Sequence, residues 1–186
     1  MAYIEVIGHN EAQGRLAAIY EELLKKRGKL ANVMLVHSLN PESLIAHMDL
    51  YMTIMFAQSP LSRPERELMA VVVSLLNKCT YCQQHHKTAL GQYWKDDDRI
   101  SRLLKDPYSA CKTERELALA NYASNLTMLP ENSHTEQWAL ELKERGFEDR
   151  AILDATLVVA YFNFVNRLVL GLGVQQEAKA GEGYNY

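Results

Sequence analysis

The sequence predicts an all-α fold, a helical bundle of about seven to eight helices. Apolar residues recur at the three- and four-residue spacing of amphipathic helices. Capping boxes, in which a hydroxyl and a carboxylate three residues apart satisfy the free amides of a helix start, occur three times. The chain contains no Asn-Gly or Asp-Gly pair, so the strongest signal for a β-hairpin is absent. The five prolines lie at the edges of apolar-periodic segments and never inside one.

Length and composition indicate one globular domain spanning residues 1–186. A chain of 186 residues buries roughly 70% of its unfolded surface without disulfide or metal staples. The hydrophobic content of 48% and the charged content of 23% exclude an intrinsically disordered chain. The net charge of −3 gives no basic excess, so nucleic acid is not an expected partner.

The first predicted helix lies in an N-terminal helical extension, residues 1–40. Apolar residues within 16–24 follow the i, i+3, i+4, i+7, i+8 pattern, and Gly28 is expected to end this helix. The next helix is expected to begin at Asn40-Pro41, a capping residue followed by proline at the first helical position. Its apolar stripe runs through 44–55.

Capping boxes predict where three further helices begin. Ser62–Glu65 opens a helix whose segment 70–76 is rich in β-branched residues, which also suit a strand. The capping box and the lack of a partner strand favour a buried helix there. Thr113–Glu116 and Ser133–Glu136 open two more helices, and a long apolar helix is expected from about Glu148 to Leu170.

No segment is typical of an export signal or a membrane span. The N-terminus lacks an apolar core flanked by basic residues, and the longest apolar stretches are well short of the ~20 residues that a spanning helix needs. We therefore expect a cytoplasmic protein without a membrane partner. The tail at 178–186 is expected to be loosely ordered.

The cysteines are too few and odd in number to form a secreted disulfide scaffold, since the chain has three. Cys79 and Cys82 form a C-x-x-C pair. Cys111 stands alone near a predicted helix start and is expected to be inert. The pair is therefore the candidate for chemistry.

A helix that begins near Cys79 would place two thiols and a histidine on one face. Cys79 and Cys82 are three residues apart, and Cys82 and His86 are four apart. The first turn of a helix favours a thiolate, and a histidine one turn further on can take the thiol proton. Glu67 precedes Cys79 on the preceding predicted helix, where a half-buried carboxylate would have a raised pKa and could shuttle protons. This pattern is typical of an activated redox dithiol.

Other interpretations of these residues stay open at this point. Cys79, Cys82 and His86 would also provide three ligands for zinc, although the chain offers no second ligand pair. Two cysteines packed in a helical core is the structural alternative. The remaining histidines are expected to be surface or capping residues, with His47 near enough to several methionines to approach a pocket. These histidines are His9, His37, His47 and His134.

The motif Glu67-x11-Cys79-x-x-Cys82-x3-His86 resembles the signature of the AhpD-like, carboxymuconolactone decarboxylase superfamily. The segment Cys79–His86 is similar to its peroxidase-related alkylhydroperoxidase branch, as are the segments 61–68, 147–154 and 161–167. The resemblance covers most of the chain, from about Asn40 to Gly173.

The resemblance implies an all-helical homo-oligomer, a trimer or hexamer with a dimer as another possibility, and thiol peroxidase chemistry. Cys82 would match the cysteine that attacks the peroxide, and Cys79 would resolve the resulting sulfenic acid as a disulfide. Glu67 and His86 would form the proton relay. No metal or organic cofactor is expected. The substrate would be a hydroperoxide, and a dithiol partner, a lipoylated or thioredoxin-like protein, would restore the thiols.

One position departs from the family pattern. Members closest to AhpD itself carry a histidine immediately before the second cysteine, where this chain has Tyr81. Tyr81 and His85 are therefore possible additional site residues, in a catalytic role or as polar or interface contacts. Two other functions remain as alternatives: a carboxymuconolactone decarboxylase-like enzyme, against which the cysteine pair argues, and a non-enzymatic redox-sensing oligomeric module.

Overall fold

A computed structural model describes residues 2–131, 135–178 and 183, and within them the chain forms α-helices and one 3₁₀ turn without a strand. This confirms the all-α prediction. Eight of the nine described helices have nine or more residues, and α2 is a single turn. The helices are α1 (Gly14–Arg27), α2 (Asn32–Leu35), α3 (Pro41–Phe56), α4 (Arg63–Leu76), α5 (Thr80–Trp94), α6 (Asp97–Lys105), α7 (Glu114–Met128), α8 (Thr135–Glu144) and α9 (Asp149–Leu172), with the 3₁₀ turn η1 at Tyr108–Ala110.

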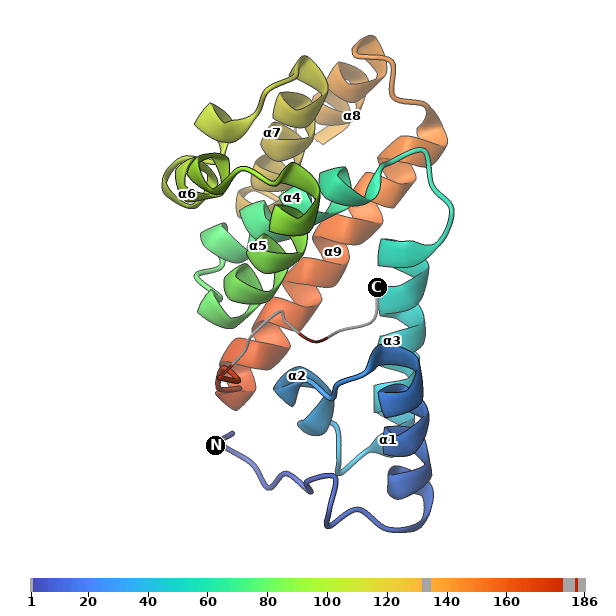
Figure 1. Ribbon diagram of the computed structural model, residues 1–186. Coiled ribbons are helices and arrows are strands. Elements are labelled where there is room, and N and C mark those ends of the chain that lie inside the picture. Colours follow the sequence, from blue (N-terminus) through green and yellow to red (C-terminus); the bar gives the residue numbers. More distant parts are fainter. Residues whose placement is uncertain (1, 132–134, 179–182, 184–186) are drawn as a thin grey trace.

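Helix α9 is the long central element of the bundle. It runs between α3 on one side and α4 and α5 on the other (Figure 1), and it also packs against α7 and α8. Its length and composition would suit a membrane span. However, Ala155, Val158, Val159 and Phe162 have no exposed surface, because they pack inside the bundle. We therefore interpret α9 as the core helix of a soluble protein.

Helix α4 is buried on every side between α5, α7 and α9. All residues from Arg66 to Ser74 are buried, which explains why its sequence is apolar without helical periodicity. The predicted capping box is complete: Ser62 accepts the Glu65 amide, and the Glu65 carboxylate accepts the Ser62 amide at 2.7 Å. The ambiguous segment 70–76 is therefore a buried helix, as its capping box predicted.

The other two predicted capping boxes have different outcomes. Thr113 accepts the Glu116 amide at 3.1 Å, but the Glu116 carboxylate does not return to Thr113. It accepts the Lys112 amide at 2.7 Å and pairs with Arg99 at 2.6 Å, which ties α7 to α6. The Ser133 box lies outside the described residues.

The N-terminal helices pack on the first half of α3. Gly28 ends α1 as predicted, since its φ of +78° is the left-handed conformation that glycine adopts freely. Residues of α1, α2 and α3 form a second apolar cluster beside the main core. Its buried members are Leu16, Ile19, Tyr20, Ala31, Met34, Leu44 and Met48.

The chain turns back after α9 and crosses α2. The amide side chain of Asn32 donates to the Gln175 carbonyl at 2.9 Å, and the Asn32 backbone amide donates to the Glu177 carboxylate. Of the tail predicted to be loosely ordered, only residues 178 and 183 are described. The segment immediately before it is therefore attached to the body of the protein.

Candidate active site

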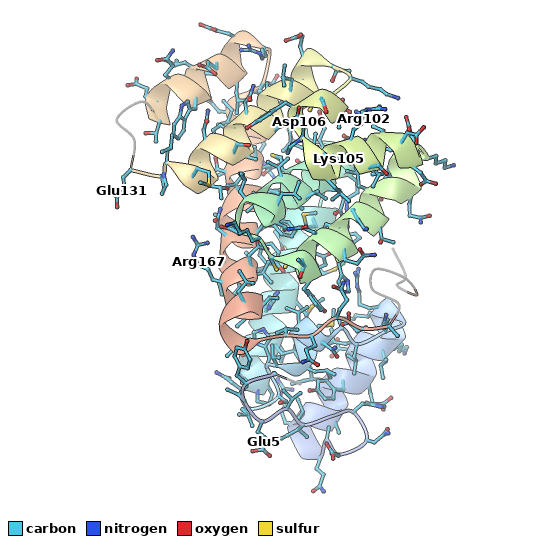
Figure 2. All side chains as sticks on the ribbon, turned by 90° about the vertical axis from the view of Figure 1, so that its left-hand side faces the viewer. Glu5, Arg102, Lys105, Asp106, Glu131 and Arg167 are labelled. Atoms are coloured by element: carbon cyan, nitrogen blue, oxygen red, sulfur yellow. The ribbon has the colours of Figure 1, made fainter. Side chains whose placement is uncertain are left out.

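Asparagines of α9 fix the turn that joins α4 to α5. The Asn77 side chain donates to Asn163 at 3.0 Å and to Asn166 at 3.1 Å, so these two polar residues interrupt the apolar helix in order to hold the turn. The turn delivers Cys79 to the N-cap of α5. Arg167, by contrast, points away from the bundle (Figure 2) and donates to the Asn163 carbonyl at 2.7 Å.

The structure brings the two cysteines of the pair into contact. Their Sγ atoms lie 2.7 Å apart, within reach of an S–H···S hydrogen bond, and both thiols are free. Cys79 Sγ also accepts the Cys82 backbone amide at 3.4 Å, as an N-cap side chain does. Cys79 has no exposed surface, and Cys82 is 3% exposed. The spacing within α5 therefore places the sulfurs as the sequence predicted.

The two thiols differ in acidity. A hydrogen bond from the Cys82 thiol, together with the Cys82 amide, lowers the pKa of Cys79 against the effect of burial. The same hydrogen bond, burial and the nearby Cys79 charge raise the pKa of Cys82. The pair therefore loses its first proton as a unit, with the remaining proton on Cys82 in this arrangement.

A cavity of about 70 Å³ lies beside the pair, with room for a few water molecules or the reactive end of a hydroperoxide. Its walls come from α5, α3, α9, α2 and the end of α1 with the segment that follows it. Cys82 and His86 line it from α5, whereas Cys79 lies outside the lining. Access therefore favours Cys82 as the sulfur that meets a ligand, although Cys79 has the lower pKa of the two.

Glu67 is fully buried and binds two cationic or potentially cationic partners. One carboxylate oxygen accepts His86 Nδ1–H at 2.7 Å, and the other accepts the Arg63 Nε–H at 2.8 Å and a second Arg63 N–H. Burial alone would raise the pKa of Glu67, but His86 and then Arg63 outweigh it, so the pKa is lowered. The prediction of a raised pKa at Glu67 is therefore wrong, while its place in a proton relay with His86 stays a prediction. Glu67 stays anionic and orients the His86 ring through Nδ1, which leaves Nε2 as the other ring nitrogen for proton transfer.

Arg63 is a site residue that the sequence analysis missed. It lies four residues before Glu67 on α4, so the i, i+4 pairing was visible in the sequence. Its guanidinium stacks 3.7 Å from the Phe56 ring centre and donates to the Met55 carbonyl at 3.0 Å. These contacts stabilise the buried positive charge of Arg63, which together with His86 keeps Glu67 ionised.

Glu177, in the segment after α9, binds both possible additional residues. Its carboxylate accepts Tyr81 O–H at 2.7 Å and His85 Nε2 at 2.8 Å. Burial would raise the pKa of Glu177, but His85, the Asn32 amide and Tyr81 together lower it to about 2. Tyr81 and His85 also line the cavity, so this carboxylate attaches the end of the chain to the cavity wall.

Replacing Glu177 with glutamine is expected to destabilise the fold by about 1–2 kcal/mol at pH 7, because the charge-assisted bonds to His85 and the Asn32 amide weaken. The folded-state pKa of about 2 lies below the unfolded value, so the contribution is complete above the unfolded pKa and is lost as pH falls through about 2. Urea unfolding of both proteins from pH 7 to pH 2 measures this. The difference should shrink in acid. Exposed Glu5 points into solvent (Figure 2), and Glu5→Gln is the control with an expected change near zero.

The remaining histidines were expected to be surface or capping residues and Cys111 to be inert, and His47 departs from this expectation. His47 is buried and lines the cavity, so its assignment as a surface or capping residue is wrong, while its approach to a pocket is confirmed. His9 is exposed and pairs with Glu21 at 2.8 Å. His134 lies outside the described residues. Burial, then the nearby Glu116, raises the pKa of Cys111 to about 11, which makes it a poor nucleophile.

The cysteine pair does not belong to a metal-ligand cluster in the described part of the chain. Within those ranges, no group of three or more His, Cys, Asp and Glu side chains is arranged to hold a metal ion. His86 Nδ1 is engaged with Glu67, and each sulfur is engaged with the other. The arrangement is that of a dithiol beside an oriented base.

Comparisons with known proteins agree with this architecture. Residues 41–125 match the sequence model of the Carboxymuconolactone decarboxylase family. An uncharacterized peroxidase-related protein from Silicibacter sp. TM1040 has a TM-score of 0.84 and 28% identity, with 97% of this chain and 94% of that chain covered. An uncharacterized peroxidase-related protein from Ralstonia eutropha JMP134, described as an alkylhydroperoxidase AhpD core, has a TM-score of 0.83 and 22% identity, covering 99% and 98% of the two chains. The uncharacterized protein YdfG of Bacillus subtilis (strain 168) is 23% identical over 145 residues, which are 77% of this chain and 95% of YdfG.

The bundle, with a C-x-x-C pair at the start of one helix and a buried glutamate on the preceding one, defines an AhpD-like protein. The match over residues 41–125 and the shared fold support the assignment of the chain to the AhpD-like, carboxymuconolactone decarboxylase superfamily. The fold and family support a peroxidase-related or decarboxylase-like activity.

Proposed function

We propose that the protein is a thiol-dependent peroxidase that reduces hydroperoxides through Cys82 and Cys79. The observation that carries this proposal is the 2.7 Å contact between two free sulfurs, of which Cys82 faces a cavity beside His86. A decarboxylase has no use for a second thiol at this distance. A peroxidase needs one, because the second thiol resolves the oxidised first.

The reaction takes place in two steps. The Cys82 thiolate attacks the terminal peroxide oxygen, an S–O bond forms, the O–O bond breaks and an alcohol leaves once its oxygen is protonated. Cys79 then attacks the Cys82 sulfenic acid, an S–S bond forms, and hydroxide leaves as water after taking a proton. An external dithiol, a lipoylated or thioredoxin-like protein, returns the two electrons, so no metal or organic cofactor takes part.

The neighbouring residues support Cys82 as the attacking sulfur. Because the sulfurs lie 2.7 Å apart, a short proton shift can move the charge of the monoanion from Cys79 to Cys82. His86 is one helical turn from Cys82, and anionic Glu67 holds its ring so that Nε2 can accept the last thiol proton. Asn166 opposes the raised pKa of Cys82 by hydrogen bonding to its sulfur.

The test is stoichiometric oxidation of the reduced protein. One equivalent of a hydroperoxide should lower the number of titratable thiols from the three of the sequence to one, and one equivalent of alcohol should form. Conversion of a carboxylated lactone with all thiols intact would instead support the decarboxylase alternative. Oxidation without turnover in excess dithiol would support the redox-sensing alternative.

We also propose that the working unit is a homo-oligomer, a trimer or hexamer or else a dimer, in the cytoplasm. Large apolar side chains on α9 remain 38–53% exposed and follow helical spacing, which is typical of a helix face covered by another copy. The molar mass in solution tests this proposal. These side chains are Leu153, Leu157 and Phe164.

A further inference from the structure

A chain of hydrogen bonds leads from the cavity to the protein surface on the side away from α5. Tyr161 Oη lies 2.7 Å from His47 Nε2, and His47 Nδ1 lies 2.8 Å from His37 Nε2. His37 Nδ1 lies 2.8 Å from Ser43 Oγ. Tyr161 and His47 line the cavity, whereas His37 and Ser43 are partly exposed. His37, which can receive a proton from solvent, is thus connected to Tyr161, which lines the cavity.

This chain can transmit a proton because it has two complete arrangements. In the first arrangement, Ser43 donates to the Asn40 carbonyl, 2.7 Å away, and its oxygen accepts His37 Nδ1–H. His37 Nε2 then accepts His47 Nδ1–H, and His47 Nε2 accepts the Tyr161 hydroxyl proton. When Ser43 donates to His37 Nδ1, each donor and acceptor exchanges its role. The Tyr161 hydroxyl then donates into the cavity. Every ring nitrogen is engaged in both arrangements.

Both groups nearest the cavity have the protonation state that this role needs. Burial, then the neighbouring His37, lowers the pKa of His47 to about 4, so its ring is neutral and has one donor and one acceptor nitrogen at neutral pH. Burial, then Tyr51 and Cys82, raises the pKa of Tyr161, so its hydroxyl keeps its proton until a strong base appears. An alkoxide is such a base.

We propose that Tyr161 is the acid that protonates the departing oxygen of the hydroperoxide, and that His47 and His37 resupply its proton from the surface. This inference rests on the proposed peroxidase function. When the Cys82 sulfur bonds to the terminal oxygen, the O–O bond breaks on the far side from the sulfur, where the alkoxide takes the Tyr161 proton. Tyr161 then takes the His47 Nε2 proton, His47 Nδ1 takes the His37 Nε2 proton, and His37 Nδ1 takes one from Ser43 or solvent.

The division of labour follows from where the groups are attached. His86 is one turn from Cys82 on α5 and therefore lies beside the sulfur, where the thiol proton is. Tyr161 comes from α9 and His47 from α3, which form other walls of the cavity. One base beside the nucleophile and one acid at the leaving group allow both proton transfers in a single encounter.

The test compares two oxidants that differ in how much their leaving group needs a proton. tert-Butyl hydroperoxide releases a strongly basic alkoxide, whereas peracetic acid releases acetate, which leaves unprotonated. Tyr161→Phe should slow Cys82 oxidation by tert-butyl hydroperoxide about 10²–10³-fold, and by peracetic acid less than about threefold. Stopped-flow oxidation of the reduced protein measures both rates. An equal loss with the two oxidants, or no loss with either, would overturn the assignment.

Two further variants keep the test decisive. Tyr122→Phe removes a hydroxyl that binds Thr156 at 2.7 Å on α9 and does not line the cavity, so both rates should match the parent. If Tyr161→Phe does not fold, His47→Gln keeps the Tyr161 hydroxyl and breaks the chain behind it. In repeated turnover with excess dithiol, where Tyr161 must regain its proton, it should reproduce the selective loss with tert-butyl hydroperoxide; an unselective loss, or no loss, would overturn the relay. A parent protein that neither oxidant oxidises would overturn the peroxidase function and this role together.

Discussion

Replacing Cys82 with serine is expected to reduce peroxide consumption to the background rate, a loss of at least about a thousandfold. A serine hydroxyl is a poor nucleophile at neutral pH unless a neighbouring base activates it, whereas a thiol needs much less activation. Cys82 is also the sulfur of the pair that faces the cavity. The measurement is hydroperoxide loss in the presence of excess dithiol, with the parent and the variant at equal concentration. Equal rates in the two proteins would rule out the proposed function.

The Cys79→Ser variant is expected to complete one oxidation and then stop. Serine is a good N-cap residue, so it can keep the bond to the Cys82 amide and preserve the start of α5. Without the second thiol, Cys82 should accumulate as a sulfenic acid, which dimedone traps and mass spectrometry locates. Cys111→Ser is the matched control and should turn over like the parent, because its thiol has a pKa raised to about 11.

The same two variants test whether the acidity of the thiol or its access to the cavity selects the attacking cysteine. The hydrogen bond between the sulfurs makes Cys79 the more acidic thiol, yet only Cys82 lines the cavity. In each single variant the serine hydroxyl does not ionise, so the remaining thiol titrates by itself. If the dimedone adduct forms on Cys79 in Cys82→Ser at the rate seen for Cys82 in Cys79→Ser, then access does not select the nucleophile, and the roles of the two cysteines need to be exchanged.

Local sequence signals predicted most of the helices, because several helix starts carry their own capping chemistry, as at Asn40, Ser62 and Thr113. The capping box at Ser62 and the glycine after α1 are local features that fix where a helix begins or ends. The Thr113 box is only half formed because Glu116 is drawn to Arg99 on a different helix. An ion pair between two different helices produces no periodic pattern in the sequence, so this departure from the capping box could not be predicted.

The candidate site was predictable where its residues share one helix. The spacing of Cys79, Cys82 and His86 on α5 follows from helical geometry alone. The cavity was not predictable, because its other walls come from α3, α9, α2 and the end of α1 with the segment that follows it. The Glu177 contact spans 92 residues to His85, and no local pattern indicates it. The acidity of Glu67 was misjudged because its partners, not its burial, decide it.

The Glu67→Gln variant is expected to have the largest effect on stability, a loss of about 3–5 kcal/mol. Glutamine has the shape of glutamate but no charge, so the Arg63 guanidinium, 11% exposed, would remain without its carboxylate partner. Thiol oxidation should slow by about 10²–10⁴-fold as well, because His86 loses the carboxylate that orients its ring. Urea unfolding and stopped-flow oxidation measure the two effects separately.

The pH dependence of this effect has a fixed sign. The pKa of Glu67 is lowered in the folded protein, since the His86 and Arg63 contacts outweigh burial. Its contribution to stability is therefore complete above the unfolded pKa of about 4.3 and is lost as pH falls through the lower folded value. The stability difference between parent and Glu67→Gln should be largest near neutrality and should narrow in acid. A difference that widens on acidification would mean that Glu67 is neutral in the fold, as its burial alone would make it.

A second substitution separates the structural from the chemical role of Glu67. Adding Arg63→Met to Glu67→Gln removes the unpaired cation, so most of the lost stability should return, because an apolar pair of similar volume often replaces a buried ion pair without loss. The oxidation rate should stay low, since His86 still lacks its anionic partner. Glu65→Gln, two residues earlier on α4, is the control and should cost about 1 kcal/mol, because its partner Arg115 is 39% exposed. A double variant that recovers both stability and rate would show that Glu67 serves the fold alone, and that His86 needs no oriented carboxylate to act as the base.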